Sequence, residues 1–461
     1  MAESQQFQNA TDFELKSVSI AALGSDDAYE IKQMIGTFSY VESVTSPFVA
    51  ATMTVADSAG LLNDLPIQGG ETVQVVIQSS ITEEPVQYNM NVWKIGNRNT
   101  KNKTQSYTLG LVSAEALNNE VTRLFKPVSG TGDKIVKDVL DTLGTEKEFF
   151  SETTEFEMKM IPANRRPFDL ISTISVKSVP KGAVGSTSDK KSKSEKNKVN
   201  GSAGFFFWET KRGYNYYSVD YLMDQAEDAW GPYVEKISNM SDGADERMTI
   251  SQAVFRSEVD IMTSLRTGKY STLLVFFNHA TGQYDEYHYS LEDAYENMKH
   301  LGAQNKPSIL PAGEDKKVSD YPTRIVTSLL DHESWYNKPD IGSYEENDGS
   351  ENPSPYCDFH KHFAEQSLMR YELLKHQQAT VVIPGNPEIC AGDAIQIKLV
   401  NKGTDERINE EPWDPESSGV YLVSEVTHTY DSTQSTNGRF VTTLRLMRDS
   451  YGDIESNHGT K

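Results

Sequence analysis

Cysteine is scarce in this chain of 461 residues, which contains only Cys357 and Cys390. Two cysteines cannot supply the disulfide framework that holds small secreted domains together. No apolar run approaches the roughly 18 residues of a membrane-spanning helix, so the sequence predicts no membrane insertion. The first residues also lack the basic and apolar segments of a signal peptide, which predicts a protein made in a cytoplasm and released without a secretion signal.

Basic residues are outnumbered in this sequence, which has 44 Lys and Arg against 67 Asp and Glu and a net charge of −23. Nonspecific binding to nucleic acid depends on Lys and Arg, so this balance opposes it. The same charge would suit a surface to which DNA must not adhere, although solubility alone also explains it. Aromatic residues make up 10% of the chain, which argues against disorder.

Catalytic motifs are also missing, because the sequence contains neither G-x-S-x-G nor H-E-x-x-H. The segment 129–134 lacks the spacing of a phosphate-binding loop and is better interpreted as a helix start capped by Asp133. Cys357, His360 and His362 lack a fourth ligand nearby. The sequence therefore predicts no catalytic residue, no cofactor and no metal site. A pair of glycosidase carboxylates needs no local motif and stays open as an alternative.

What the sequence does contain is a repeated β pattern. Residues 70–77 read GETVQVVI and residues 392–399 read GDAIQIKL, so aliphatic side chains alternate onto one face in both. In each place a second strand, a polar stretch and a third strand follow, over 92–111 and 421–446. Eight residues alone could agree by chance. The ordered agreement of three successive elements favours a module that occurs twice in one chain.

The expected fold class is α+β, mainly β. It consists of two duplicated tube-like antiparallel β-barrel domains with an α/β middle domain and insertions. Residues 1–115 are predicted to form the first barrel, and residues 266–298 plus 377–448 the second, with a hairpin at 272–289 inside the latter. The middle domain is predicted over 116–265, with helices over 133–143 and from Pro167 and a strand over 154–161.

Several segments are predicted to lie outside these modules. Residues 178–203 combine lysines with Gly and Ser and predict a flexible loop, for which contact with DNA, lipid or an acidic partner is the less favoured reading. The aromatic segment 205–219 predicts a packed hairpin rather than a sugar-binding surface. Residues 299–376 are predicted as an insertion that packs with the middle domain, with helices at 325–330 and 358–376. Residues 449–461 are predicted as a polar tail that frays.

Three stretches, taken in order, resemble the central baseplate hub proteins of contractile-tailed, T-even-like bacteriophages. They are residues 63–112 with the helix at 133–143, residues 166–174 with the aromatic hairpin through 223, and residues 366–446. The Pro-Gly-Asn-Pro segment at 384–387, with the Gly-Asp strand after it, is also similar to spike-hub proteins of contractile injection systems. The collinear order carries the resemblance, because no single motif is diagnostic.

This resemblance implies a structural hub in the tail baseplate of a virion, assembled in the host cytoplasm. It implies a homotrimer whose two barrels per chain form a pseudo-hexameric ring that joins a trimeric central spike to a hexameric tail tube and forms part of the DNA ejection channel. The implied partners are the spike, the tail tube or tube-initiator protein, the tape measure protein and the baseplate wedge proteins. The alternatives are a tail-associated cell-wall hydrolase and a carbohydrate-binding tail module.

Gln74 and Gln396 occupy the same place in the two copies of the repeat. Because strand side chains alternate, both glutamines are predicted to point away from the barrel core. Within the hub interpretation they are candidate inter-barrel contacts around the ring. The alternative is that they are two ordinary glutamines that face solvent.

Overall fold

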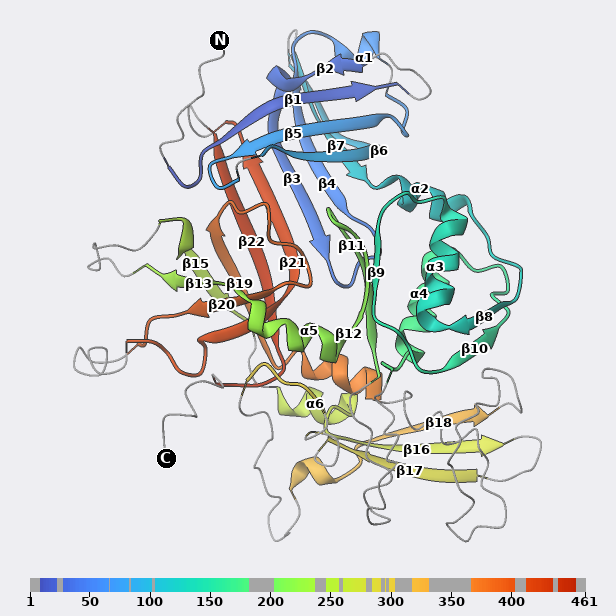
Figure 1. Ribbon diagram of the computed structural model, residues 1–461. Helices are drawn as coiled ribbons and strands as arrows, with labels where there is room; N and C mark the ends of the chain where they lie inside the picture. The colour runs from blue at the N-terminus through green and yellow to red at the C-terminus, as the bar shows by residue number, and fades with distance from the viewer. Residues whose placement is uncertain are drawn as a thin grey trace.

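A computed structural model shows a mainly β protein, as the sequence predicts, with several sheets and a smaller helical lobe (Figure 1). The residues that it describes are 9–22, 28–65, 67–82, 84–101, 104–181, 203–236, 246–256, 260–278, 284–291, 295, 298–302, 317–330, 366–402, 412–433 and 438–452. Within this part of the chain, no helix is both long enough and apolar enough to cross a membrane.

The first sheet is antiparallel and runs in the order β3-β4-β7-β6-β5-β1, with the short strand β2 at the outer edge of β1. Alternate residues of β4 and β5 are buried, which matches the alternation expected from the sequence. The single-turn helix α1 (Leu61–Asp64) lies where the sequence predicts a helical turn. The strands are β1 (Phe13–Ala21), β2 (Ala28–Glu30), β3 (Ile35–Ser43), β4 (Ala50–Asp57), β5 (Thr72–Ser79), β6 (Val86–Lys101) and β7 (Thr104–Val112).

The second sheet runs in the order β15-β19-β22-β21-β20-β13-β14. Strands β14 and β15 are separated only by Ser251, whose backbone N–H donates to Val382, so the pairings form a closed circuit. The strands are β13 (Trp230–Glu235), β14 (Thr249–Ile250), β15 (Gln252–Phe255), β19 (Gln377–Pro384), β20 (Ala394–Lys398), β21 (Gly419–Asp431) and β22 (Arg439–Arg448).

The long hairpin β21–β22 joins the two sheets. Its base packs in the second core through residues such as Val426 and Leu444, whereas Tyr430 and Phe440 near its tip belong to the first core. Strand β21 pairs with β3, and the Phe440 N–H donates to the Thr11 carbonyl at 2.7 Å, which closes the first sheet. The red strands of this hairpin lie beside the blue β3 in Figure 1.

The helical lobe follows β7 and packs α3 and α4 against the β11–β12 hairpin. Both predicted helices, the predicted strand and the predicted aromatic hairpin are present, and Gly144 ends α3 with φ of 73°. Asp133 is not the cap as predicted, because Thr131 occupies that position and the Asp133 carboxylate accepts from Thr154 instead. The elements are α2 (Ala114–Val121), β8 (Val128–Thr131), α3 (Gly132–Leu143), β9 (Phe149–Ser151), β10 (Glu157–Met160), α4 (Pro167–Lys177), β11 (Phe205–Thr210), β12 (Gly213–Ser218) and α5 (Val219–Asp224).

The hairpin expected inside the second barrel forms, but in another sheet. Strands β16 (Ser271–Asn278) and β17 (Tyr284–Ser290) pair with β18 (Arg324–Leu330), so the assignment of residues 266–298 to the second barrel is corrected: β13, β14 and β15 occupy that place. The two strands of a hairpin form main-chain hydrogen bonds with each other, so the sequence of the hairpin does not indicate which sheet it joins. The helix predicted over 325–330 is likewise wrong, because its β-branched residues pair in parallel with β16.

The chain beyond residue 448 is not a fraying tail at its beginning, because Asp449 and Ser450 are both fully buried. The Asp449 carboxylate is ion-paired with Arg370 at 2.9 Å and hydrogen-bonded to the His300 ring at 2.7 Å, and these partners compensate the burial of its charge. Arg370 lies in residues 366–373, which are helical, as predicted. Residues 357–362 with the Cys-His group, residues 182–202 of the lysine-rich loop and the start of the helix predicted from 358 lie outside the described residues.

The remaining short helices connect these parts. They are η1 (Lys32–Met34), η2 (Gln225–Asp228), η3 (Glu246–Met248), α6 (Ile261–Thr267) and η4 (Val318–Asp320).

Candidate functional site

The sequence repeat appears in the structure as a repeated order of strands. The order β4-β7-β6-β5 in the first sheet corresponds to β19-β22-β21-β20 in the second, and every neighbouring pair in both sets is antiparallel. The matching Gly-acid dipeptides therefore begin equivalent strands, β5 and β20. The repeat is a feature of the fold and not a chance agreement of eight residues.

The two Gly-acid corners also form the same backbone hydrogen bonds. In the first copy, the Gly70 N–H donates to the Val92 carbonyl at 2.6 Å, and the Val92 N–H donates to the Glu71 carbonyl at 2.9 Å. In the second copy, the same two bonds join Gly392 to Val423 at 2.8 Å and Val423 to Asp393 at 2.9 Å. Val92 and Val423 thus occupy equivalent places.

A β-bulge follows each of these valines. The pairing of β6 with β7 shifts between Val92 and Lys94, and that of β21 with β22 shifts between Val423 and Glu425. Bulges are specific features of a strand that re-aim the chain, so an identical position supports a common module. The corner glycines have φ of 96° at Gly70 and 93° at Gly392, a left-handed region that favours glycine.

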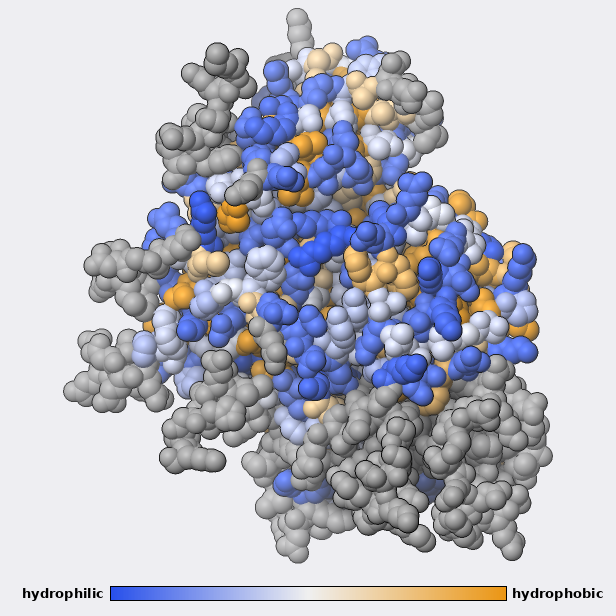
Figure 2. All heavy atoms as spheres, in the orientation of Figure 1, coloured by the Kyte–Doolittle hydropathy of each residue, from blue (hydrophilic) through white to orange (hydrophobic). Residues whose placement is uncertain are grey.

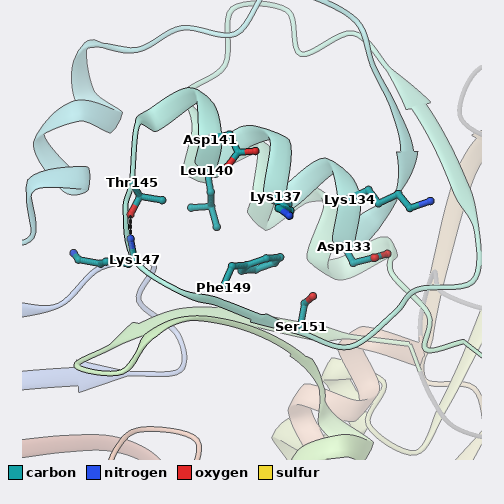
Figure 3. Close-up of a pocket in the computed structure, with 9 residues that line it drawn as sticks. All are labelled: Asp133, Lys134, Lys137, Leu140, Asp141, Thr145, Lys147, Phe149 and Ser151. Atoms are coloured by element: carbon teal, nitrogen blue, oxygen red, sulfur yellow. Dashed lines mark hydrogen bonds between the residues drawn. The ribbon is translucent and has the colours of Figure 1, made fainter.

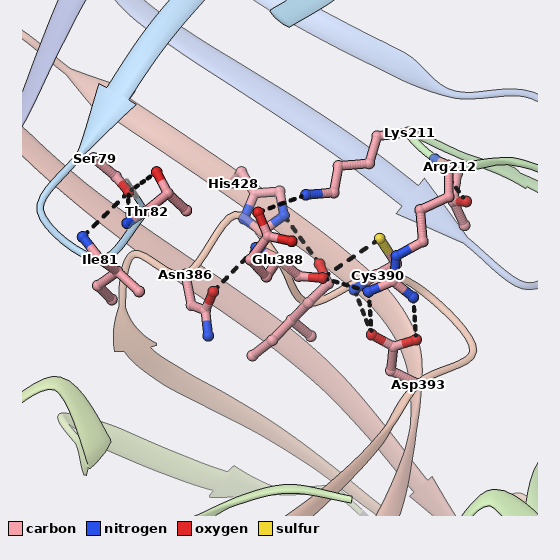
Figure 4. Close-up of polar contacts among 12 residues, drawn as sticks. Ser79, Ile81, Thr82, Lys211, Arg212, Asn386, Glu388, Cys390, Asp393 and His428 are labelled. Carbon is pink, nitrogen blue, oxygen red and sulfur yellow. Dashed lines mark hydrogen bonds and ion pairs between the residues drawn. The ribbon is translucent and has the colours of Figure 1, made fainter. Parts of the chain in front are cut away.

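The acid of each corner fixes the turn before its strand. The Glu71 carboxylate accepts from the Gln68 N–H at 2.7 Å and the Gly69 N–H at 2.9 Å. The Asp393 carboxylate accepts from the Cys390 N–H at 3.0 Å and from the Arg212 guanidinium at 2.9 Å (Figure 4). Both carboxylates are occupied in holding backbone, so the geometry assigns them a structural role.

Glu42 on β3 connects three separate parts of the chain. Its buried carboxylate accepts from the Tyr40 hydroxyl at 3.0 Å, the Lys211 N–H at 2.7 Å and the Ala391 N–H at 3.0 Å. Burial raises the pKa of Glu42 to about 7, although these hydrogen bonds oppose the rise. The carboxyl group therefore ties the first sheet to the tip of the aromatic hairpin and to the second corner.

Lys147 forms a second buried link that sequence reasoning missed. Its ammonium group is ion-paired with Glu115 at 2.6 Å and with Glu209, a residue of β11 that is 1% exposed. Burial raises the pKa of Glu209, and the nearby Lys147 opposes that rise. This group holds α2, the loop before β9 and the aromatic hairpin together.

A cavity of about 330 Å³ lies between α3 and β9 (Figure 3). Two of its charged groups are held by the fold: the Asp133 carboxylate accepts a hydrogen bond from Thr154, and Lys147 is ion-paired with two glutamates. Neither histidine nor cysteine lines this cavity, so it lacks the usual nucleophile–base pair. The lining residues are Asp133, Lys134, Lys137, Leu140, Asp141, Thr145, Lys147, Phe149 and Ser151. Across the part of the chain that the structure describes, there is also no group of three potential metal ligands.

Gln74 and Gln396 lie as the strand alternation predicts. Both are partly exposed, and their strand neighbours Val73, Val75, Ile395 and Ile397 are buried. Gln74 pairs in register with Ser19 and Asn89 on the first sheet, whereas Gln396 lies opposite Val420 on the second. The structure does not bring the two glutamines together, and their role as inter-barrel contacts stays a prediction.

An exposed apolar patch lies on the helical lobe. Val121, Phe125 and Ile161 are 81%, 68% and 71% exposed. Leu124 pairs with Arg165, and Val128 pairs with Met160, so Phe125 and Ile161 lie in the gap between these two pairings. Figure 2 shows hydrophobic atoms gathered along the edge of this lobe, whereas most of the face over the two closed sheets is hydrophilic. Such patches are typical of interaction surfaces.

Comparison with known proteins adds one match over nearly the whole chain. No protein-family model matches. A protein of Vibrio phage KVP40 named as a probable baseplate hub protein is 23% identical over 441 residues, covering 94% of this chain and 93% of its own length. This match confirms the resemblance. Over nearly its whole length, the chain is similar to a phage baseplate hub protein. It is accordingly a structural component of the virion tail.

Two solved tail proteins are also similar to this chain. A tail protein from Neisseria meningitidis has a TM-score of 0.49 and 11% identity, covering 95% of this chain and 97% of its own. A 43 kDa tail protein of prophage MuSo2 from Shewanella oneidensis has a TM-score of 0.47 and 10% identity, covering 94% and 98%.

Proposed function

We propose that three copies of this chain form a pseudo-hexameric ring that joins the trimeric central spike of the baseplate to the hexameric tail tube. The observation that carries this proposal is the pair of equivalent corners in one chain, matched in strand order, hydrogen bonds and bulge. A trimer and a hexamer cannot match directly under closed rotational symmetry. Three chains with two equivalent modules each present six similar faces on one side and threefold contacts on the other.

In this proposal the ring is formed by residues 1–115 and by residues 377–448, together with β13, β14 and β15. Residues 116–229 form a middle domain that lies to one side of the ring. The segment from residue 261 to residue 376 is an insertion beside it, which includes the β16–β17–β18 sheet. The proposed partners are the central spike, the tail tube or its initiator protein, the tape measure protein and the wedge proteins. The exposed patch of Val121, Phe125 and Ile161 supports partner contacts outside the ring.

The proposed ring also forms part of the channel through which the genome passes during ejection. A net charge of −23 per chain supports this role, because an acidic wall repels DNA phosphates and opposes adhesion. At physiological ionic strength such repulsion extends over only about 8 Å, so it acts on DNA close to the wall. DNA passage through the ring therefore requires no specific binding site.

We further propose that the chain has no enzymatic activity. The match to a hub-type protein supports this reading over a cell-wall hydrolase. The burial of Phe205, Tyr214 and Tyr216 in the aromatic hairpin also disfavours a carbohydrate-binding module, because stacking on a sugar needs an exposed ring. Purified protein is expected to leave peptidoglycan intact in a gel clearing assay. Clearing that disappears on replacing a single carboxylate would establish the hydrolase instead.

Electron microscopy of the purified chain tests the proposed ring directly. The expected particle is a closed ring with three protruding lobes and a central opening whose rim shows six similar modules. Particles without a central opening would contradict the hub function. A ring of six chains would contradict the proposed pairing of two modules per chain.

Substitution of the two repeat glutamines tests their proposed place around the ring. Gln74→Lys/Gln396→Lys introduces six like charges per trimer, and like charges in contact at an interface cost several kcal/mol. The double variant is expected to dissociate at sub-micromolar concentration in the analytical ultracentrifuge. A variant that stays as associated as the parent protein would remove these glutamines from the interface but not overturn the hub function.

A further inference from the structure

The two sheets of one chain join where β21 pairs with β3, a contact that we call the internal seam, and this contact suggests how two chains join. Strand β21 is used in two halves: residues 419–422 pair with β20, and residues 425–431 pair with β3 of the other sheet. The bulge at Ser424 separates the halves. The outer half of β21 is thus the element by which the second module binds the first.

The equivalent strand of the first module has an open edge at the same place. The inner half of β6 pairs with β5 over residues 86–91, as β21 pairs with β20. Beyond its own bulge, the outer half of β6 over residues 94–101 pairs with β7 alone, within the residues that the structure describes. Trp93 at this bulge is 54% exposed. Exposed strand edges of this kind readily accept another strand.

The strand equivalent to β3 is also open. Leu111 and Leu446 are equivalent, because each lies opposite the valine of its own corner. Leu111 also pairs with the residue before Thr52 on β4, and Leu446 pairs with the residue before Thr380 on β19, so Thr52 and Thr380 are equivalent. Ser39 of β3 lies opposite Thr52, and Val254 of β15 lies opposite Thr380. Strand β15 is therefore the counterpart of β3.

The free edge of β15 has no partner strand in the part of the chain that the structure describes, because β15 pairs only with β19. Val254 in its middle is 47% exposed. The first module thus has a free strand edge on β6, the counterpart of β21. The second module has a free strand edge on β15, the counterpart of β3.

We propose that the outer half of β6 in one chain pairs antiparallel with β15 of the next chain, as β21 pairs with β3 within a chain. This inference rests on the proposed ring, because the same heterologous contact must close after three chains. Each chain then contributes one internal seam and one external seam. The ring becomes a continuous circuit of six modules joined by main-chain hydrogen bonds.

The internal seam also gives the register of the external one. Thr429 of β21 lies opposite Ser39 of β3, and their hydroxyl groups are 3.3 Å apart. Val254 is the counterpart of Ser39. Ser106 lies three residues before Leu109 on β7, and Val441 lies three residues before its counterpart Leu444 on β22, so Ser106 and Val441 are equivalent. Ser106 pairs with Asn99, and Val441 pairs with Thr429, so Asn99 is the counterpart of Thr429. Asn99 of one chain therefore lies opposite Val254 of the next.

The two kinds of seam differ in their side chains. At the internal seam, Tyr430 and Phe440 are buried in the first core. Their counterparts in the first module are the polar residues Thr100 and Gln105, by the same count. The external seam therefore buries less apolar surface and relies more on backbone pairing. A single chain can complete its own cores before it meets its neighbours.

Engineered disulfides test this register. The proposed pair is Asn99→Cys/Val254→Cys in a Cys357→Ser/Cys390→Ala background, because residues opposite each other on paired strands are at disulfide distance. After mild oxidation, the band at 51.6 kDa is expected to shift to a covalent trimer of three times that mass on a non-reducing gel. Ser39→Cys/Thr429→Cys is the matched positive control and must form a disulfide within one chain.

Gln87→Cys/Val254→Cys is the matched negative control, because Gln87 is an exposed residue on the half of β6 that already pairs with β5. Equal cross-linking of this control would overturn the proposed seam. A disulfide between residues 99 and 254 of the same chain would also overturn it. If no cross-link forms and the protein sediments as a trimer, the proposed pairing of β6 with β15 is wrong but the proposed ring is not contradicted. If no cross-link forms and the protein is a monomer, both proposals are wrong.

Discussion

At the scale of single residues, the two corner glycines perform the same task in different surroundings. Both have positive φ, which an L-residue adopts at a cost of about 1–2 kcal/mol. A Cβ at Gly392 would also overlap the Trp208 ring, whose Nε1 is fixed by a hydrogen bond to Ala391 at 2.8 Å. The Trp208 ring therefore adds a steric requirement for glycine in the second corner.

We predict that Gly392→Ala destabilises the protein more than Gly70→Ala. The first change is expected to cost roughly 3 kcal/mol or more, from backbone strain plus overpacking, and the second about 1–2 kcal/mol from the backbone alone. Urea unfolding of both variants measures the difference. Equal losses would show that the Trp208 ring moves aside without cost.

Glu42 gives a pH dependence whose sign follows from its burial. Its pKa is raised to about 7 in the folded protein from 4.5 in a free side chain, so the folded state binds this proton more tightly. The resulting stabilisation is complete below about pH 4.5 and is lost as the pH rises through about 7. We predict that the difference in unfolding free energy between the parent protein and Glu42→Gln changes across this range. A difference that stays constant from pH 4.5 to 8 would contradict the assignment.

At the scale of elements, the β21–β22 hairpin is the part on which both cores depend. Tyr430 packs against Phe13, Phe38 and Phe440, and its hydroxyl is 3.0 Å from that of Tyr88. We predict that Tyr430→Ala lowers the unfolding free energy by about 3–5 kcal/mol, as for other buried aromatic residues. Tyr430→Phe, which removes only the hydroxyl, is expected to cost about 1 kcal/mol. Similar losses for both variants in urea unfolding would show that the ring packing contributes little.

Most elements of the fold could be predicted from local sequence, but their partners could not. Strand alternation and Gly-acid starts located β5 and β20, and helical spacing located α3 and α4. Strand β13 contains Gly231-Pro232 and pairs in parallel with β20 and β14, so no hairpin signal reveals it. The sequence therefore predicts residues 266–298 in its place, because their hairpin has a stronger local signal, but that hairpin forms a separate sheet with β18.

The buried hydrogen bonds and ion pairs of the site could not be predicted from the sequence for a related reason. The partners of Glu42 lie 169 and 349 residues away, so only the folded chain brings them together. Asp449 likewise resembles the start of a polar tail until Arg370 and His300 are placed beside it. Long-range ion pairs leave no periodic signal in the residues around them. By contrast, the Gln74 and Gln396 positions follow from strand alternation alone.

At the scale of the whole molecule, the proposed ring explains why one chain carries the same module twice and a large negative charge. In the proposed ring, six modules would meet a hexameric tube, three chains would meet a trimeric spike, and the acidic wall would keep DNA from adhering. Each part of this account requires three chains in a closed assembly.

Sedimentation equilibrium of the purified chain at micromolar concentration therefore tests the central claim most directly. The proposed ring predicts a single species with three times the chain mass of 51.6 kDa. A protein that remains a monomer, or that forms a dimer or a hexamer, would contradict it.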